Sequence, residues 1–209
     1  MGIDVGGTFT DLVVVDHAQG RVVTAKHPSQ AGDPSAAILA GIAEMALDSR
    51  AIERVVHGTT IATNALLERR GATTGLVTTA GCRDVIEIGR GRRLVEGGMF
   101  DIGFRRPEPL VPRSRRIEVG ERMRADGEEL APLAAADLAA AAARLQDVES
   151  VVVCFLHSYR FPAHEREAER ALRALLGPEV FITLSSTVNP QFREFERFST
   201  AVANGYVGP

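Results

Sequence analysis

The chain has 209 residues, of which 45% are hydrophobic, and its formal net charge is -3 at pH 7. This length and composition can bury a substantial core, either as one large domain or as two small ones. The slight negative charge gives no basic field that would neutralise a phosphate backbone, so we expect no nucleic-acid partner. No apolar run approaches the ~20 residues that span a bilayer, so we also expect no membrane partner.

Cysteine usage and the first residues bear on the cellular compartment. Only Cys82 and Cys154 are present, far apart and without further ligands at metal-binding spacing. This pattern indicates neither a disulfide framework nor a zinc site. The start of the chain has no basic region followed by an apolar stretch, as an export signal would. We therefore expect a cytoplasmic protein.

The first third of the chain combines a meander with alternating strands and helices. Short β-branched runs predict five strands, at residues 3–5, 11–16, 21–27, 54–57 and 74–79. Helical spacing of apolar residues predicts helices at 33–48 and 60–70. Asp33 and Pro34 suit the start of the first helix, and Gly71 suits the end of the second. The brief segment at 54–57 is a candidate for a buried strand.

The remainder is irregular at first and regular later. Arginines, glycines and prolines crowd residues 90–112 without a hydrophobic period, which indicates a long loop. Beyond it the pattern predicts strands and helices in alternation: strands at 116–122, 150–156 and 179–184, and helices at 135–146, 162–176 and 190–206. The charged residues of the last helix, at 193–197, are interpreted as a solvated face.

The order β-β-β-α-β-α-β predicts an α/β fold of the ribonuclease-H-like class, the half-unit of the actin, hexokinase and Hsp70 superfamily. We expect residues 1–184 to form an amino-terminal, phosphate-binding lobe with an irregular insertion near 90–115. Residues 185–209 are then expected to form a helix that leads into a second domain missing from this chain.

The strongest chemical signal lies in the turn between the first two predicted strands. It combines two acids, two glycines and two threonines: Asp4, Gly6, Gly7, Thr8, Thr10 and Asp11. Glycines let backbone N–H groups approach phosphate oxygens, and the threonine hydroxyls add donors. The two carboxylates are hard oxygen ligands suited to the magnesium of a bound triphosphate. The alternative is a plain Gly-Gly hairpin turn with polar residues around it.

A second polar cluster comprises His57, Thr59, Thr60 and Asn64, at a predicted strand-to-helix junction. Such a junction offers free N–H groups to an anion or carbonyl, so these residues are candidate substrate ligands. A capped helix start is the alternative, with Thr59 or Thr60 as the cap. Arg90 is a further substrate candidate, although a salt bridge at a helix end explains it equally well.

Five ordered strings carry a more specific resemblance: DVGGTFTDLVV, RVVHGTTIATNALLERRGA, GLVTTAGCRDVIEIGR, VVVCFLHSY with PAHE, and EFERFSTAVANGYVGP. In order and spacing, these strings resemble the amino-terminal region of the hydantoinase A/5-oxoprolinase family, which includes ketone carboxylase subunits. The resemblance runs through essentially the whole chain. Family members are much longer, and their second phosphate turn and adenosine-binding half lie beyond the last residue here.

The resemblance implies an ATP-dependent hydrolase of cyclic amides, of the hydantoin or 5-oxoproline type, with ATP and Mg²⁺ as cofactors. Phosphorylation of the amide oxygen makes the carbon more electrophilic, and water then cleaves the C–N bond. Asp4 and Asp11 would hold magnesium and orient the acceptor oxygen, with interchangeable roles, while Gly6, Gly7 and the threonines of the turn hold phosphates. A second hydantoinase-type subunit or domain is the expected protein partner.

Three alternatives remain open at this point. A subunit of an ATP-dependent ketone carboxylase shares the same opening motifs. A fragment that binds nucleotide without catalysis is plausible because the second half is missing. A sugar-kinase-type enzyme would share the phosphate turn but lack HGTTIATNALLER. Since the family binds nucleotide between two lobes, we expect this chain alone to bind ATP weakly and to turn it over little or not at all.

Overall fold

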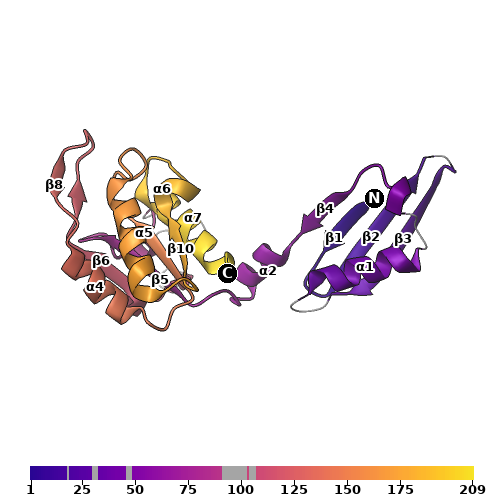
Figure 1. Cartoon of the computed structure of the whole chain (residues 1–209), viewed down its shortest axis with the longest axis horizontal. Helices are drawn as coiled ribbons and strands as arrows, with labels where there is room; N and C mark the ends of the chain where they lie inside the picture. Colours follow the sequence, from indigo (N-terminus) through magenta and orange to yellow (C-terminus); the bar gives the residue numbers. More distant parts are fainter. Residues whose placement is uncertain (18, 30–32, 46–48, 91–102, 104–106) are drawn as a thin grey trace. The chain divides into compact units, whose positions relative to one another are not determined.

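The computed structural model describes residues 1–17, 19–29, 33–45, 49–90, 103 and 107–209. They form two compact units, Met1–Arg70 and Gly71–Pro209 (Figure 1). The boundary expected near residue 184 does not separate these units, because the last helix packs on the sheet of the second unit. Most of the insertion expected near 90–115 falls outside the described residues. In the described part of the chain, no helix is long and apolar enough to cross a membrane.

The first unit is a four-stranded mixed sheet with one helix packed against it. Its elements in chain order are β1 (Gly2–Val5), β2 (Phe9–Asp16), β3 (Arg21–Pro28), α1 (Pro34–Glu44), β4 (Val56–Thr59) and α2 (Ile61–Leu67). The sheet order is β3-β2-β1-β4, with antiparallel pairing throughout except between β1 and β4, which are parallel. The predicted meander is thus confirmed, and the order is that expected of a ribonuclease-H-like amino-terminal lobe.

Helix α1 starts at an aspartate cap and packs through a glycine. The Asp33 carboxylate accepts hydrogen bonds from the first-turn N–H groups of Ser35 and Ala36, at 3.1 and 3.3 Å. Gly41 lies so close to the sheet that a Cβ atom there would stand 2.6 Å from the buried Leu12 side chain. A glycine is therefore required where the helix meets β2.

The prediction of a buried strand at 54–57 is wrong. Strand β4 begins at Val56, which is 62% exposed, and the preceding Val55 is 53% exposed. Helix α2 contributes no buried residue within the described part of the chain. An apolar run indicates a strand, but its burial depends on a covering layer, and in the first unit that layer is α1, which packs against β2 and β3.

The second unit is a parallel sheet covered on both faces. Its elements in chain order are β5 (Thr74–Thr79), α3 (Val85–Ile88), β6 (Arg116–Val119), β7 (Arg122–Met123), β8 (Glu129–Ala131), α4 (Ala135–Arg144), β9 (Ser150–Cys154), α5 (Ala163–Leu176), β10 (Phe181–Leu184), α6 (Ser185–Val188) and α7 (Glu194–Val207). The sheet order is β10-β9-β5-β6, and β7 and β8 form a separate antiparallel ribbon. The predicted strand at 116–122 is split between β6 and β7, and the short helices α3 and α6 were not predicted from the sequence.

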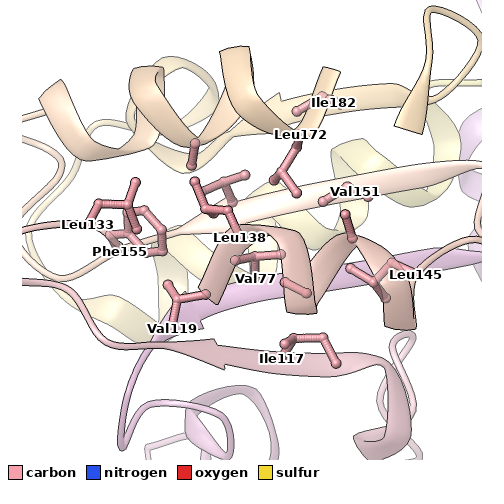
Figure 2. Packing of buried hydrophobic residues seen from close by; sticks show 14 of the residues in the cluster. Val77, Ile117, Val119, Leu133, Leu138, Leu145, Val151, Phe155, Leu172 and Ile182 are labelled. Carbon is pink, nitrogen blue, oxygen red and sulfur yellow. The ribbon is translucent and has the colours of Figure 1, made fainter. Parts of the chain in front are cut away.

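Two buried clusters hold this sheet between its helices. On one face, Leu138 of α4 and Leu172 of α5 pack with Val77 and Val151 of the central strands (Figure 2). On the other face, α7 contributes Phe198 and two smaller residues to a cluster with Leu76, Val152 and Cys154. The central strands β5 and β9 are buried at every residue. Such double coverage explains why their sequences are nearly continuous apolar runs.

The interpretation of 193–197 as a solvated face is wrong for Arg197, whose side chain is fully buried. Its guanidinium donates to the Ser185 hydroxyl at 3.2 Å, to the Gln191 carbonyl at 3.0 Å and to the Phe155 carbonyl at 2.9 Å. Ser185 in turn donates to the buried Glu165 carboxylate at 2.6 Å. Burial of a charge is tolerated because its donors are satisfied.

Neither cysteine is an activated thiol. Both Cys82 and Cys154 are buried and free. Burial raises the pKa of Cys82, and it raises the pKa of the completely buried Cys154 well above its ordinary value. A thiolate is the nucleophilic form of cysteine, so these environments disfavour cysteine chemistry.

Candidate functional site

The turn between β1 and β2 is tight, and its geometry favours glycine. The N–H of Gly6 donates to the Phe9 carbonyl at 3.0 Å, which closes the turn. A Cβ atom on Gly6 would stand 3.0 Å from that same carbonyl oxygen, a closer approach than most Cβ atoms make. The first glycine of the motif thus suits the turn itself, as well as the approach of a ligand to the backbone.

The second glycine brings the turn against helix α2. A Cβ atom on Gly7 would stand 2.9 Å from the Asn64 side-chain nitrogen. Asn64 also donates to the Thr60 hydroxyl at 3.4 Å, at the amino-terminal end of α2. The structure therefore places two of the predicted substrate candidates, Thr60 and Asn64, beside the predicted phosphate turn.

Asp4 and Asp11 face each other across the β1–β2 pair, since they are register partners. Cross-strand partners project from the same face of a sheet, so the two carboxylates are neighbours. Asp11 accepts hydrogen bonds from the Lys26 ammonium at 2.9 and 3.2 Å. Gly58 of β4 is paired with Asp4, and a Cβ atom on Gly58 would lie 3.7 Å from the Asp4 carboxylate. The face thus presents two acids and one lysine.

The two threonines of the turn differ in accessibility. Thr8 is exposed, whereas Thr10 is completely buried and its hydroxyl lies 3.0 Å from that of Ser29. Ser29 donates from its hydroxyl to the Gly6 carbonyl at 2.8 Å and from its N–H to the Thr8 carbonyl at 2.9 Å. Thr10 and Ser29 thereby stabilise the turn through hydrogen bonds on its buried side. Ser29 was not predicted from the sequence, because nothing in the local motif connects it with residues twenty positions earlier.

His57 and Thr59 lie on the face opposite the two aspartates. Their register partners on β1 are Ile3 and Val5, which alternate with Asp4. The Thr59 hydroxyl donates to the Val5 carbonyl at 3.3 Å and accepts the N–H of Ile61 at 3.2 Å. For Thr59 the geometry therefore matches the helix-start alternative, in which the hydroxyl satisfies an early N–H of the helix.

Arg90 belongs to the second unit and not to the unit that carries the turn. Its guanidinium forms an ion pair with Glu196 of α7. Nearby, Glu87 pairs with the buried Arg116 at 2.7 Å. Arg90 thus forms a salt bridge with a partner more than a hundred residues away in sequence, while its contact with substrate stays a prediction.

The family follows from comparison with known proteins. A model of the hydantoinase/oxoprolinase N-terminal region matches residues 1–176. The chain belongs to this family. Caprolactamase subunit alpha of Pseudomonas jessenii is 40% identical over 219 residues, covering 100% of this chain and 31% of the relative. The acetophenone carboxylase gamma subunit of Aromatoleum aromaticum is 33% identical, covering 98% of this chain and 30% of the relative.

Solved structures agree with this assignment. The P. jessenii ATP-dependent caprolactamase structure matches with a TM-score of 0.82 and 39% identity, covering 100% of this chain and 31% of that one. A nucleotide-free acetone carboxylase structure, solved to study ATP-dependent acetone carboxylation, matches with a TM-score of 0.84 and 28% identity, covering 99% and 32%. The predicted family and α/β fold class are confirmed. This hydantoinase/oxoprolinase chain spans about a third of the length of these relatives.

Proposed function

We propose that this chain is the phosphate-binding amino-terminal region of an ATP-dependent enzyme that opens cyclic amides. The observation that carries the proposal is the β1–β2 turn, where two glycines, the Asp4–Asp11 pair and Asn64 of α2 converge. The relative named caprolactamase subunit alpha, at 40% identity, supports a cyclic amide as the substrate class. Hydantoins and 5-oxoproline belong to the same chemical class.

The turn contributes to phosphate binding in two ways. Gly6 and Gly7 keep side chains away from the backbone, so that phosphate oxygens can approach its N–H groups. The exposed Thr8 adds a hydroxyl donor, while the buried Thr10 stabilises the turn through its hydroxyl contact with Ser29. Five residues remain proposed substrate-side residues: His57, Thr59, Thr60, Asn64 and Arg90. Of these, Thr60 and Asn64 lie nearest the turn.

The paired aspartates fit a magnesium ion bound together with nucleotide. Mg²⁺ usually takes one or two carboxylates and completes its shell with phosphate oxygens and water, which matches Asp4 and Asp11 as neighbours on one exposed face. The described residues contain no group of three or more potential metal ligands, so the phosphates would supply the other oxygens. When bound, magnesium neutralises phosphate charge. Asp11 forms an ion pair with Lys26 at 2.9 Å, and it would exchange this partner for magnesium if the ion were bound there.

The reaction divides one difficult hydrolysis into two steps. Transfer of the γ-phosphoryl group to the amide oxygen makes the carbonyl carbon more electrophilic, and water attack then breaks the C–N bond with release of phosphate. Asp4 or Asp11 orients the acceptor oxygen. The subunit names of relatives support a further subunit as the partner, which would complete the nucleotide and substrate sites.

A ketone carboxylase subunit is the second candidate. The match to acetone carboxylase over 99% of the chain favours it, since a ketone oxygen can be activated by phosphorylation in the same way. Dependence of phosphate release on bicarbonate and a ketone would identify this activity, whereas an open-chain acid formed from a lactam identifies the hydrolase.

Calorimetric titration of magnesium-ATP into the 209-residue chain tests the phosphate turn. We expect weak binding, with little or no turnover, and loss of the binding signal in Asp11→Ala. Asp16→Ala is the matched control, because Asp16 lies on the same strand away from the turn and should leave binding intact. Equal affinity of the wild type and Asp11→Ala would contradict the proposal. Formation of a stable phosphorylated product would instead indicate a kinase.

A further inference from the structure

The second unit has the topology of a doubly wound sheet, whose strand order reverses between β5 and β9. From β5 the chain moves to β6 on one side, and it then returns past β5 to β9 and β10 on the other. Helix α3 after β5 lies with α7 on one face, while α4 and α5 cover the other face. In such sheets the carboxyl ends of the two strands at the reversal diverge and leave a crevice, where ligands bind.

A pocket of about 460 Å³ lies among segments that follow these two strands, together with the start of α7. Its apolar wall consists of Val85 and Ile88 from α3, Leu156 two residues after β9, and Phe195 from the first turn of α7. The volume suits a small organic ligand, and an apolar wall with a few polar groups is the usual composition of such sites.

The pocket is also lined by two arginines and two glutamates, whose charges sum to zero. Arg90 pairs with Glu196, and a backbone hydrogen bond together with this guanidinium lowers the pKa of Glu196, which stays ionised. Arg193 and Glu194 also line the pocket. The pocket therefore offers a guanidinium donor and a carboxylate acceptor beside the Arg90–Glu196 pair, without net charge.

We infer that this pocket binds a small, neutral cyclic amide. The amide oxygen accepts from the Arg193 guanidinium, the amide N–H donates to the Glu194 carboxylate, and the apolar ring contacts Ile88, Leu156 and Phe195. A phosphate or dicarboxylate fits poorly, since Glu194 and Glu196 line the same space and one of its two arginines, Arg90, is already paired with Glu196. This binding place in the second unit is separate from the phosphoryl transfer assigned to Asp4 and Asp11 of the first unit, and the choice of a cyclic amide as its ligand rests on the proposed function.

Amide chemical shifts of the 209-residue chain, titrated with 2-pyrrolidinone in the absence of nucleotide, test this site. We expect concentration-dependent shifts at residues 85–90, 156 and 193–196, with little change elsewhere. N-methyl-2-pyrrolidinone keeps the carbonyl and ring but lacks the N–H donor. It should bind about tenfold more weakly, because one hydrogen bond to a charged group is lost.

Two variants separate recognition from folding. Glu194→Ala removes the acceptor of the lactam N–H, so it should reduce 2-pyrrolidinone affinity about tenfold and abolish most of the difference between the two lactams. Ile88→Trp should fill the pocket and abolish the shifts. The control is Leu175→Trp, because the Leu175 side chain on α5 is about as exposed as that of Ile88 but does not line the pocket. This variant should bind the lactam normally.

Several results would overturn the inference. Shifts outside the pocket, no shifts up to saturating lactam, or equal binding by Ile88→Trp and the wild type would each do so. Stronger perturbation of the pocket by inorganic phosphate or by proline, a zwitterion, would also contradict a neutral amide site. Failure of the phosphate turn is distinguishable, because it abolishes magnesium-ATP binding while leaving the lactam shifts at the second unit in place.

Discussion

The two units differ in how completely they cover their sheets. Strands β5 and β9 of the second unit are buried at every residue, with helices on both faces. In the first unit β4 is exposed at every residue, and the face that carries the two aspartates lies opposite α1. The second unit thus has a closed core with a local pocket, whereas the first presents its proposed phosphate turn on an open surface.

The largest effect should come from the closed core. Leu138→Ala removes a side chain that is 2% exposed and packed between α4 and the sheet, so it should lower the free energy of unfolding of the second unit by about 3 kcal/mol. Urea unfolding with hydrogen exchange resolved by unit measures this loss. Leu175→Ala, at an exposed position, should change stability little. Equal loss of hydrogen-exchange protection in both units would show that they unfold together, and it would contradict a separate closed core in the second unit.

The buried guanidinium provides the next effect. Arg197→Leu removes three hydrogen bonds and leaves the Ser185 hydroxyl and two buried carbonyls without this donor. The substitution should therefore lower the free energy of unfolding of the second unit by about 2 kcal/mol. Thermal unfolding followed by circular dichroism measures the change. Arg173→Leu is the matched control, because its ion pair with Glu169 is an exposed pair within one helix. If the two variants were equally stable, the buried network would have no structural importance.

In the first unit, the contact between the turn and α2 is open to a paired test. Gly7→Ala forces the Asn64 carboxamide to move, and we expect a loss of about 1 kcal/mol. Asn64→Ala creates room for the added methyl group, so the double variant should recover part of that loss. Denaturant unfolding of the four proteins completes the cycle. Strict additivity of the two substitutions would mean that the turn and α2 are not in contact.

Acid should weaken both units in the same pH range. The Ser35 hydroxyl beside Asp33 lowers the pKa of that carboxyl in the first unit, and the Arg113 guanidinium lowers the pKa of Asp84 in the second. A lowered pKa in the folded state means that the unfolded chain binds more protons as pH falls, so stability is present at neutral pH and lost below about pH 4. Unfolding midpoints measured across this range should fall. Constant midpoints, or a rise on acidification, would contradict the assigned pairings.

Local sequence signals located much of the fold. The β-branched runs predicted β1, β2, β3, β5 and β9 closely, since their apolar pattern reflects backbone pairing that the structure retains. Burial was harder to predict, as β4 shows, because it depends on which layers cover a strand. Arg197 was also unpredictable, since its partners come from three separate segments.

The candidate site, like the fold, was predictable from the sequence only where its residues are close together in the chain. The turn between the first two strands was predicted together with its two aspartates, and the structure pairs Asp4 with Asp11 because a short connection joins adjacent strands. The contacts of Ser29 with Thr10 and of Lys26 with Asp11 were not predicted, because they depend on how β3 and the residue after it lie against β2. The second-unit pocket combines α3, the end of β9 and the start of α7, and such a convergence has no local sequence pattern.

The β1–β2 turn of the first unit is proposed to hold the nucleotide phosphates. The most direct test of this role is the amide spectrum of the 209-residue chain as magnesium-ATP is added. We expect the largest shifts at Gly6, Gly7 and Thr8, smaller ones at the start of α2, and their disappearance in Asp11→Ala. Shifts confined to the second unit, or shifts at the turn that persist unchanged in Asp11→Ala, would contradict it.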